Sequence, residues 1–268
     1  MSVTIEDLVA RIKGHRCYNH PIFHDWAEVA PAPEAVGALF HQIQKFCAST
    51  RPGWSFPQAL GELGLTKQSQ LLEEIVESES DHGPQLATMA GFIVNRTARQ
   101  ALCPDLSNQA AVEATLKTFS DRLLGSLPGY DPTSGLTVQA RRAIAVFDRR
   151  RLTDRESTLR NLGTALALEM ISNQQLIPGE KHCLVDKGIY GVTMEDAEMH
   201  YLEEHWGEIG AEHQHEMNAI QAVAGVLDES TARDIVEGVD EFLDALSALW
   251  DVLDSSLLGS GYRDEVAA

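Results

Sequence analysis

The sequence is short of positive charge. Its 268 residues include 21 Lys and Arg against 40 Asp and Glu, which gives a formal net charge of −19 and a pI near 4.8. Proteins that bind nucleic acids need a basic surface to contact phosphates, so we expect no nucleic-acid partner. The same excess of acid favours solubility, and it weakly favours a substrate with an amino group over a free carboxylate.

Cysteine and long apolar runs are scarce as well. Cys17, Cys47, Cys103 and Cys183 form neither a CxxC metal motif nor a dense disulfide framework, which is typical of a reducing compartment. The N-terminal segment has no apolar signal core, and no stretch approaches the roughly 20 apolar residues that span a bilayer. We therefore expect a cytoplasmic protein with no membrane partner.

Strand patterns and linkers are also missing. The chain shows no convincing alternation of apolar and polar residues, no internal repeat and no Pro/Gly/Ser-rich linker. These absences predict an all-α protein in which residues 1–268 form a single domain. The main expected helices cover residues 5–16, 34–48, 56–63, about 66 to the Gly83-Pro84 pair, 108–124, 138–150, 156–174, 198–217 and 230–258.

The richest pattern of metal-binding residue types lies in the predicted helix 198–217, EMHYLEEHWGEIGAEHQHEM. His205, Glu208, Glu212 and His215 follow one another at spacings of three, four and three, which places them on one stripe of a continuous helix. Imidazole and carboxylate together suit iron or another first-row divalent ion. An acidic, solvated helix that happens to carry histidines is the alternative.

Two other predicted helices carry ionisable residues on their apolar faces. Leu72 and Ile75 are followed on one face by Glu79 and His82, and Glu169 shares a stripe with three leucines of its own helix. Buried ionisable groups need partners or a metal. The alternatives are a charged last turn of a helix for the Glu79 and His82 pair and a solvated position for Glu169.

The three regions together contain two E-x-x-H pairs and one isolated glutamate. Di-iron helical bundles project such pairs and single glutamates inward from separate helices. No catalytic residue beyond the metal ligands is predicted, and His213 lies off the stripe. The candidate ligands are Glu79, His82, Glu169, His205, Glu208, Glu212 and His215.

These motifs resemble those of the haem-oxygenase-like dimetal oxidases. The resemblance covers the HPIF segment at 20–23, ESDH at 79–82, ALALEMISNQQLIP around Glu169, and YLEEH at 201–205. The late motif of that family usually reads H-x-x-x-D-x-x-H. Here Ile209 follows His205 at the Asp position, and Glu208, Glu212 and His215 meet the same spacing with Glu in the places of the first His and the Asp.

The resemblance implies a bundle of about seven helices that binds two Fe(II) ions per chain and uses O2 as co-substrate. It implies a non-haem di-iron oxidase that oxidises an amino acid, an amine or a fatty acid, in a natural-product pathway. A small molecule is the expected partner, with an external electron donor and a homodimer left open. The alternatives are a metal-free thiaminase-like or pyrroloquinoline-quinone-synthase-like enzyme of the same fold, and a non-catalytic all-α binding protein.

Overall fold

The chain is all-α in the parts that the computed structural model describes, which are residues 3–51, 53–78, 82–207 and 210–259, with the side chain of His82 outside the description. Short 3-10 segments cover Val146–Arg151 and Ala197–Met199, and π-helical turns cover Ser172–Leu176, His182–Asp186 and Asp254–Leu258. The α-helices are α1 (Ile5–Gly14), α2 (Ile22–Val29), α3 (Pro33–Thr50), α4 (Ser55–Glu62), α5 (Thr66–Ser78), α6 (His82–Thr97), α7 (Gln109–Leu124), α8 (Val138–Ala145), α9 (Arg155–Ile171), α10 (Ile177–Lys181), α11 (His200–His205), α12 (Ala211–Ala224) and α13 (Ala232–Leu253).

Local sequence explains where the main helices begin. Asp154 caps α9 by accepting a hydrogen bond from the Ser157 N–H at 2.9 Å, and Asn108 caps α7 in the same way. Such side-chain caps satisfy N–H groups that have no partner inside the helix. These starts agree with the predicted helices 108–124 and 156–174.

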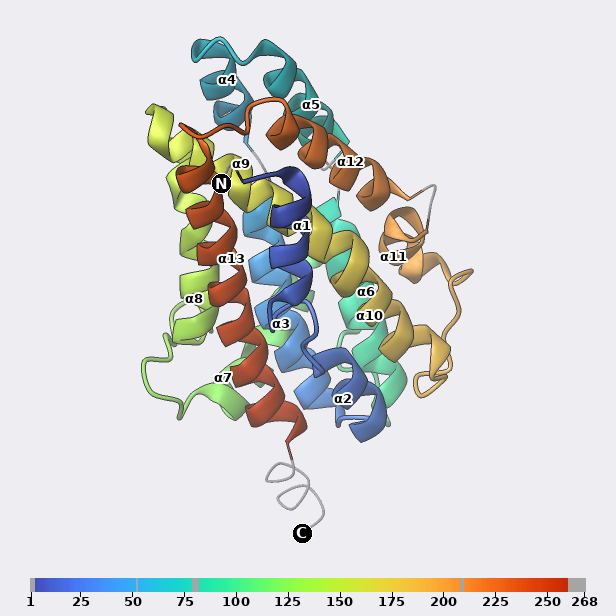
Figure 1. The fold of residues 1–268 in the computed structure, drawn as a ribbon. Coiled ribbons are helices and arrows are strands. Elements are labelled where there is room, and N and C mark those ends of the chain that lie inside the picture. Colours follow the sequence, from blue (N-terminus) through green and yellow to red (C-terminus); the bar gives the residue numbers. More distant parts are fainter. Residues whose placement is uncertain (1–2, 52, 79–81, 208–209, 260–268) are drawn as a thin grey trace.

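Helix α9 lies at the centre of the bundle. Its residues from 157 to 171 are buried on every face except at Arg160, as expected for a helix in the middle of a large core. The most extensive helix–helix contact among the described residues joins α9 to α13, and Figure 1 shows these two helices running through the molecule. A Cβ atom at Gly163 would overlap the carbonyl oxygen of Ile235, and one at Gly238 would overlap that of Arg160. Glycine therefore lets the two backbones touch.

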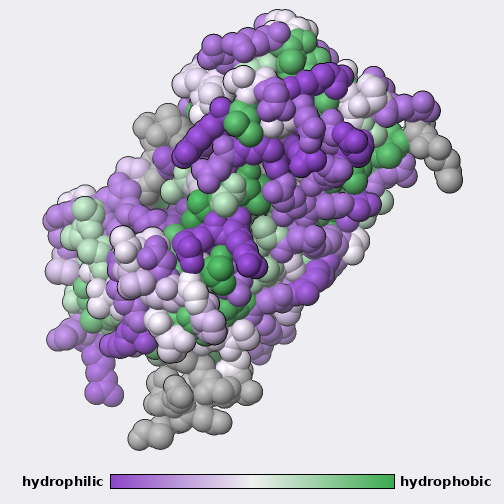
Figure 2. Space-filling view, turned by 90° about the vertical axis from the view of Figure 1, so that its left-hand side faces the viewer, coloured by the Kyte–Doolittle hydropathy of each residue, from purple (hydrophilic) through white to green (hydrophobic). Residues whose placement is uncertain are grey.

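The ends of the molecule are covered by different helices. Figure 1 shows α4 and α5 at one end, near the last turn of α12, and α2 and α7 at the other. The buried apolar residues form one connected core cluster. The face in Figure 2 is mostly hydrophilic, with apolar residues in small separate groups. No described helix combines the length and apolar character needed to cross a bilayer.

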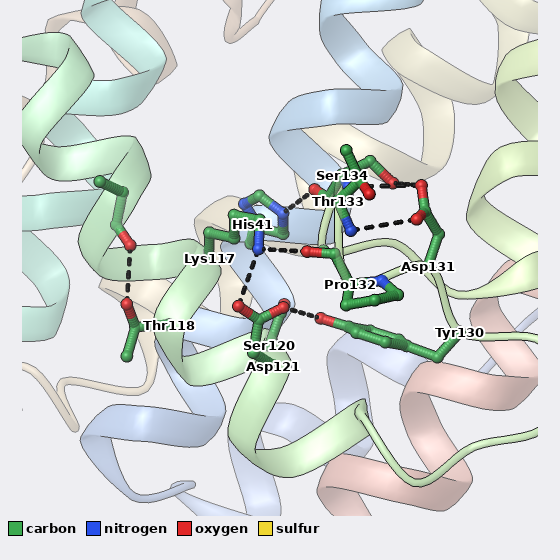
Figure 3. A network of polar contacts seen from close by, with 12 residues as sticks. His41, Lys117, Thr118, Ser120, Asp121, Tyr130, Asp131, Pro132, Thr133 and Ser134 are labelled. Carbon is green, nitrogen blue, oxygen red and sulfur yellow. Dashed lines mark hydrogen bonds and ion pairs between the residues drawn. The ribbon is translucent and has the colours of Figure 1, made fainter.

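A polar network joins α3 and α7 to the loop before α8 (Figure 3). His41 is buried, and its Nε2 lies 3.1 Å from the carbonyl oxygen of Ser134. Lys117 donates to Asp121 at 2.8 Å and to the Pro132 carbonyl at 2.7 Å. Here ionisable side chains hold a loop against two helices.

Two expectations about the extent of helices were wrong. The predicted helix 156–174 continues past its expected end, because a π-helical turn at 172–176 leads directly into α10, where Pro178 occupies one of the first positions. The Gly83-Pro84 pair, near which a helix was predicted to end, lies in the first turn of α6, and residues 79–81 before it are outside the described parts of the chain. The predicted helix 198–217 is two helices, because Gly207 adopts a φ of +89° between α11 and α12, which right-handed helix does not allow.

Candidate metal centre

Glu169 supplies the first acidic group of the candidate centre. It follows two turns of apolar residues on α9, and its side chain is only 5% exposed. The prediction that Glu169 lies on a buried face is therefore confirmed. Helix α9 packs against α12, so Glu169 faces the helix that carries the late ligand pattern.

Glu212 and His215 lie one turn apart on α12 and are 6% and 4% exposed. Each residue of the set Glu169, Glu212 and His215 offers one ligand atom within 4.8 Å of the others. His215 Nδ1 lies 3.8 Å from Glu169 Oε2. The structure thus brings together residues that are more than 40 positions apart in the sequence.

The two buried imidazole rings are each held through one nitrogen. His205 Nδ1 lies 2.6 Å from the Tyr201 carbonyl oxygen, and since a carbonyl only accepts, Nδ1 carries the proton of the neutral ring. His205 Nε2 then presents its lone pair and lies 3.8 Å from Glu212 Oε1. His215 Nε2 lies 2.6 Å from Ser78 Oγ, and donation to that hydroxyl would likewise place the lone pair of the neutral ring on Nδ1. Fixing one ring nitrogen in this way is how proteins orient metal-binding histidines.

His205 belongs to the short helix α11, not to the helix of Glu212 and His215. The single stripe predicted for the four late residues is therefore wrong, because the break at Gly207 separates them. His205 still comes close to Glu212 through the fold rather than through helical spacing. His213 is exposed, as its position off the stripe predicted.

Three predicted ligands cannot be placed. Glu79 and Glu208 lie outside the described residues, and of His82 only the backbone is described, in the first turn of α6. Residues 79–81 lie outside the described parts of the chain, so the predicted shared face of Leu72, Ile75, Glu79 and His82 stays a prediction. The roles of Glu79, His82 and Glu208 stay predictions.

The described residues fit a divalent metal ion. Two carboxylates and two imidazoles are the donor set of first-row divalent ions. Two ligand atoms about 2.1 Å from one ion are at most about 4.2 Å apart, so the cluster of Glu169, Glu212 and His215 needs only a small contraction. Histidine and glutamate could hold Fe(II), Mn(II) or Zn(II) in this arrangement.

Buried polar residues surround the cluster. Glu216, one turn beyond Glu212, accepts hydrogen bonds from the side-chain amides of Asn173 and Gln174. Arg150 is buried against the rings of Phe147 and Phe56. Burial lowers the pKa of Arg150 to about 10, and the nearby carboxylate of Glu169 acts in the opposite direction.

A cavity of about 120 Å³ adjoins the cluster and has Glu169 and Glu212 in its wall. Tyr201, whose ring lies 4.3 Å from that of His205, lines the same space. Helix α3 supplies much of the remaining lining through Gln44, Lys45, Phe46, Cys47, Ala48 and Thr50, with Arg51 directly after it. The arrangement can place a small molecule next to a metal ion.

Sequence reasoning missed the residues that complete this site. Ser78 and Tyr201 contact the two histidines, and Gln44 faces the cavity. A signal existed for Gln44, because it follows Phe40 by four residues and so extends the apolar stripe of its helix. No such signal marks Ser78, whose role depends on the packing of α5 against α12.

The fold and the cluster define an all-α protein with a buried Glu/His centre beside a cavity. Comparison with protein-family models gives no match, and comparison with curated proteins gives no relative of significant similarity. The function must therefore be argued from the site.

Proposed function

We propose that this protein is a non-haem di-iron oxidase that activates O2 to oxidise a small molecule in a biosynthetic pathway, with the haem-oxygenase-like bundle as its fold. One observation carries the proposal: Glu169 from α9 and Glu212 and His215 from α12 converge beside a cavity. Buried carboxylates gathered at one point repel one another unless cations or protons compensate them. A bound divalent ion supplies that compensation.

The chain's own residues have distinct tasks in this proposal. Three residues would hold one ion: Glu169, Glu212 and His215. His205, which lies beside Glu212, would bind the same ion from that side. Ser78 orients the ring of His215, and the Tyr201 carbonyl fixes the proton of His205. Iron, when bound, supplies the redox chemistry with O2. The apolar surroundings on α9 limit water at the site.

The second ion would need further ligands. Glu79, His82 and Glu208 are the remaining candidates from the sequence. Bundles of this class hold about two iron ions with carboxylates between them. We therefore propose a second binding position next to the described cluster.

The test is anaerobic loading with Fe(II), metal analysis and then O2 consumption. His215→Gln is compared with His213→Gln, a matched control because His213 is exposed on the same helix. We expect about two iron ions per chain and O2 uptake in the wild type and the control, and loss of both in His215→Gln. Equal iron content in the two variants would overturn the centre. Iron binding without O2 consumption would exclude an oxidase, and no iron binding at all would favour the metal-free enzymes of this fold.

A further inference from the structure

Glu216 is a buried acid that the proposed set of metal ligands does not include. It lies on α12, one turn after Glu212, and is 7% exposed. Its two carboxylate oxygens accept from different residues: Oε2 from the side-chain amide of Asn173 and Oε1 from that of Gln174. Since a carboxylate only accepts, both amide nitrogens must face Glu216. These three side chains form a polar clamp, which we call the Glu216 clamp.

A π-helical turn supplies both donors of the clamp. Asn173 and Gln174 belong to the turn at 172–176, which directly follows α9. Neighbouring residues of a regular α-helix point about 100° apart, yet here both side chains reach one carboxylate. The Tyr18 hydroxyl donates to Gln174 Oε1 at 2.8 Å, which turns the amide nitrogen of Gln174 toward Glu216. Such π-helical turns are frequent at functional sites.

The clamp lies about one turn away from a candidate ligand on each side. Asn173 follows Glu169 by four residues, and Glu216 follows Glu212 by the same number. Helices α9 and α12 pack against each other (Figure 1). Their separation decides whether Glu169 and Glu212 can share an ion, because ligand atoms of one ion lie at most about 4.2 Å apart. The Glu216 clamp holds the two helices together next to this point.

A carboxylate makes this clamp stronger than a neutral side chain would. Both oxygens of Glu216 accept, which suits the ionised form. Hydrogen bonds to an ionised acceptor are roughly twice as strong as those between neutral groups. Groups that hold metal-binding residues in this way commonly change metal affinity when they are removed.

We propose that Glu216 is a positioning residue of the metal centre. By holding the turn after α9 against α12, it keeps Glu169 at the distance from Glu212 and His215 at which the three residues share one ion. Glu216 itself binds no ion. This assignment rests on the proposed metal-dependent function, because it is a bound ion that the spacing of the two helices serves.

An effect of Glu216 through charge alone would give different results. A negative charge near a cation attracts it whatever its hydrogen bonds are, so removing a charge at Glu216 would weaken metal binding and adding one at Asn173 would strengthen it. A positioning role predicts that both changes weaken metal binding, because each disrupts the same hydrogen bond. Making both changes in one chain restores this bond in the reverse direction, from residue 216 to residue 173.

The test uses the full chain and Co(II) alone, with the variants Glu216→Gln, Asn173→Asp and the double variant that carries both changes. Affinity is measured by titration at about pH 8, where the facing carboxylates of Asn173→Asp repel each other. The visible spectrum of bound Co(II) reports the coordination geometry. We expect each single variant to bind Co(II) about tenfold more weakly or worse, with an altered spectrum. The double variant should return close to the affinity and spectrum of the wild type.

Two control variants separate positioning from other effects. Glu229→Gln removes the charge of an exposed acid just after α12 and should leave Co(II) binding unchanged. Asp154→Ala removes the side-chain cap at the opposite end of α9, so it should destabilise the chain without changing the affinity for Co(II). Urea unfolding of the metal-free proteins measures the stability of each variant.

The outcomes distinguish this inference from the proposed function. A wild type that does not bind Co(II) overturns the metal centre and this assignment with it. If the wild type binds Co(II), an unchanged affinity in either single variant overturns the positioning role alone. Opposite effects of the two single variants would show a charge effect instead, and a double variant as weak as the single ones would also overturn the assignment. A loss of affinity in Asp154→Ala equal to that in Glu216→Gln would mean that general stability, not the clamp, is responsible.

Discussion

Two regions of the molecule bury histidine beside acidic residues, and they do so in different ways. Around His41 the polar side chains bind backbone carbonyls or pair cation with anion, as Lys117 does with Asp121 (Figure 3). At the candidate centre, His205 and His215 each have one nitrogen fixed and the other 3.8 Å from a carboxylate. The first arrangement holds a loop, whereas the second points ligand atoms at a common space. Burial of ionisable residues alone therefore does not identify a functional site; the partners of their polar atoms do.

A third buried acid provides the largest expected effect. Glu180 on α10 is buried, its Oε2 has no hydrogen-bond partner among the described residues, and burial raises its pKa to about 8. Below pH 4.5 the carboxyl is protonated in both the folded and the unfolded chain. As pH rises from 4.5 to about 8, the unfolded chain loses this proton first, so stability falls. Glu180→Gln should therefore stabilise the fold at pH 9 by on the order of 4 kcal/mol and have little effect at pH 4.

Urea unfolding at the two pH values measures this. A variant that gains the same stability at both pH values would show that packing, not ionisation, is responsible. Such a result would remove Glu180 as an example of an acid held without a cation.

Metal binding at the candidate centre should raise the free energy of unfolding, whereas the His41 region should take no part in this effect. An ion that binds only the folded chain raises stability by about 2.7 kcal/mol at a free concentration 100 times its Kd. Glu169→Gln should lose this gain and keep an apo melting temperature equal to or above that of the wild type, because it removes one of the clustered negative charges. Thermal melts with and without Mn(II) measure both effects. Melting temperatures that do not respond to metal would count against a preformed cluster.

The stability of the His41 region should depend on the hydrogen bonds that its buried polar side chains make. Gln42 is fully buried, donates to Ser120 Oγ and to the Gly135 carbonyl, and accepts from the Thr137 N–H. Gln42→Leu leaves these groups unpaired and should cost about 2 kcal/mol, with metal binding unchanged. The exposed Gln58→Leu should stay within about 0.5 kcal/mol. A similar result for both variants in urea unfolding would mean that the network does not stabilise the loop.

The smallest effect concerns the charge of His41. Burial lowers the pKa of His41 below its ordinary value of 6.5. Below pH 6.5 the unfolded chain therefore binds a proton that the folded chain does not, so stability falls with falling pH until the lower folded pKa is passed. His41→Gln should show a shallower loss of stability between pH 6.5 and 5, by about 1 kcal/mol or less. If stability falls with pH in parallel for the wild type and His41→Gln, that result would contradict a neutral, buried His41.

The buried position of Glu169 could be predicted because an acid on a stripe of leucines is a local, periodic signal. It predicted Glu212 and His215 through spacing on a helix that does exist. The single helical stripe was wrong for His205, because the positive φ of Gly207 ends the helix, and it is tertiary packing that places His205 next to Glu212.

Other failures have the same origin. The sequence gives no sign that Arg150 is buried, since its position depends on the rings of Phe56 and Phe147 from other segments. The cavity depends on helices α3, α7, α9 and α12 together. Periodicity describes one helix at a time, so it cannot report which faces of different helices enclose a common space.

The backbone contact between α9 and α13 has a consequence for how this protein tolerates change. Gly163 lies less than two turns before Glu169, and it is fixed against α13 at the point where Gly238 makes the reciprocal contact. Any side chain at either glycine would act as a wedge between the helices and displace the far end of α9. In a survey of all single substitutions, these two glycines should therefore be as intolerant as the metal ligands, although they carry no chemistry. Such a survey would separate them from the ligands only if folding and activity were scored independently.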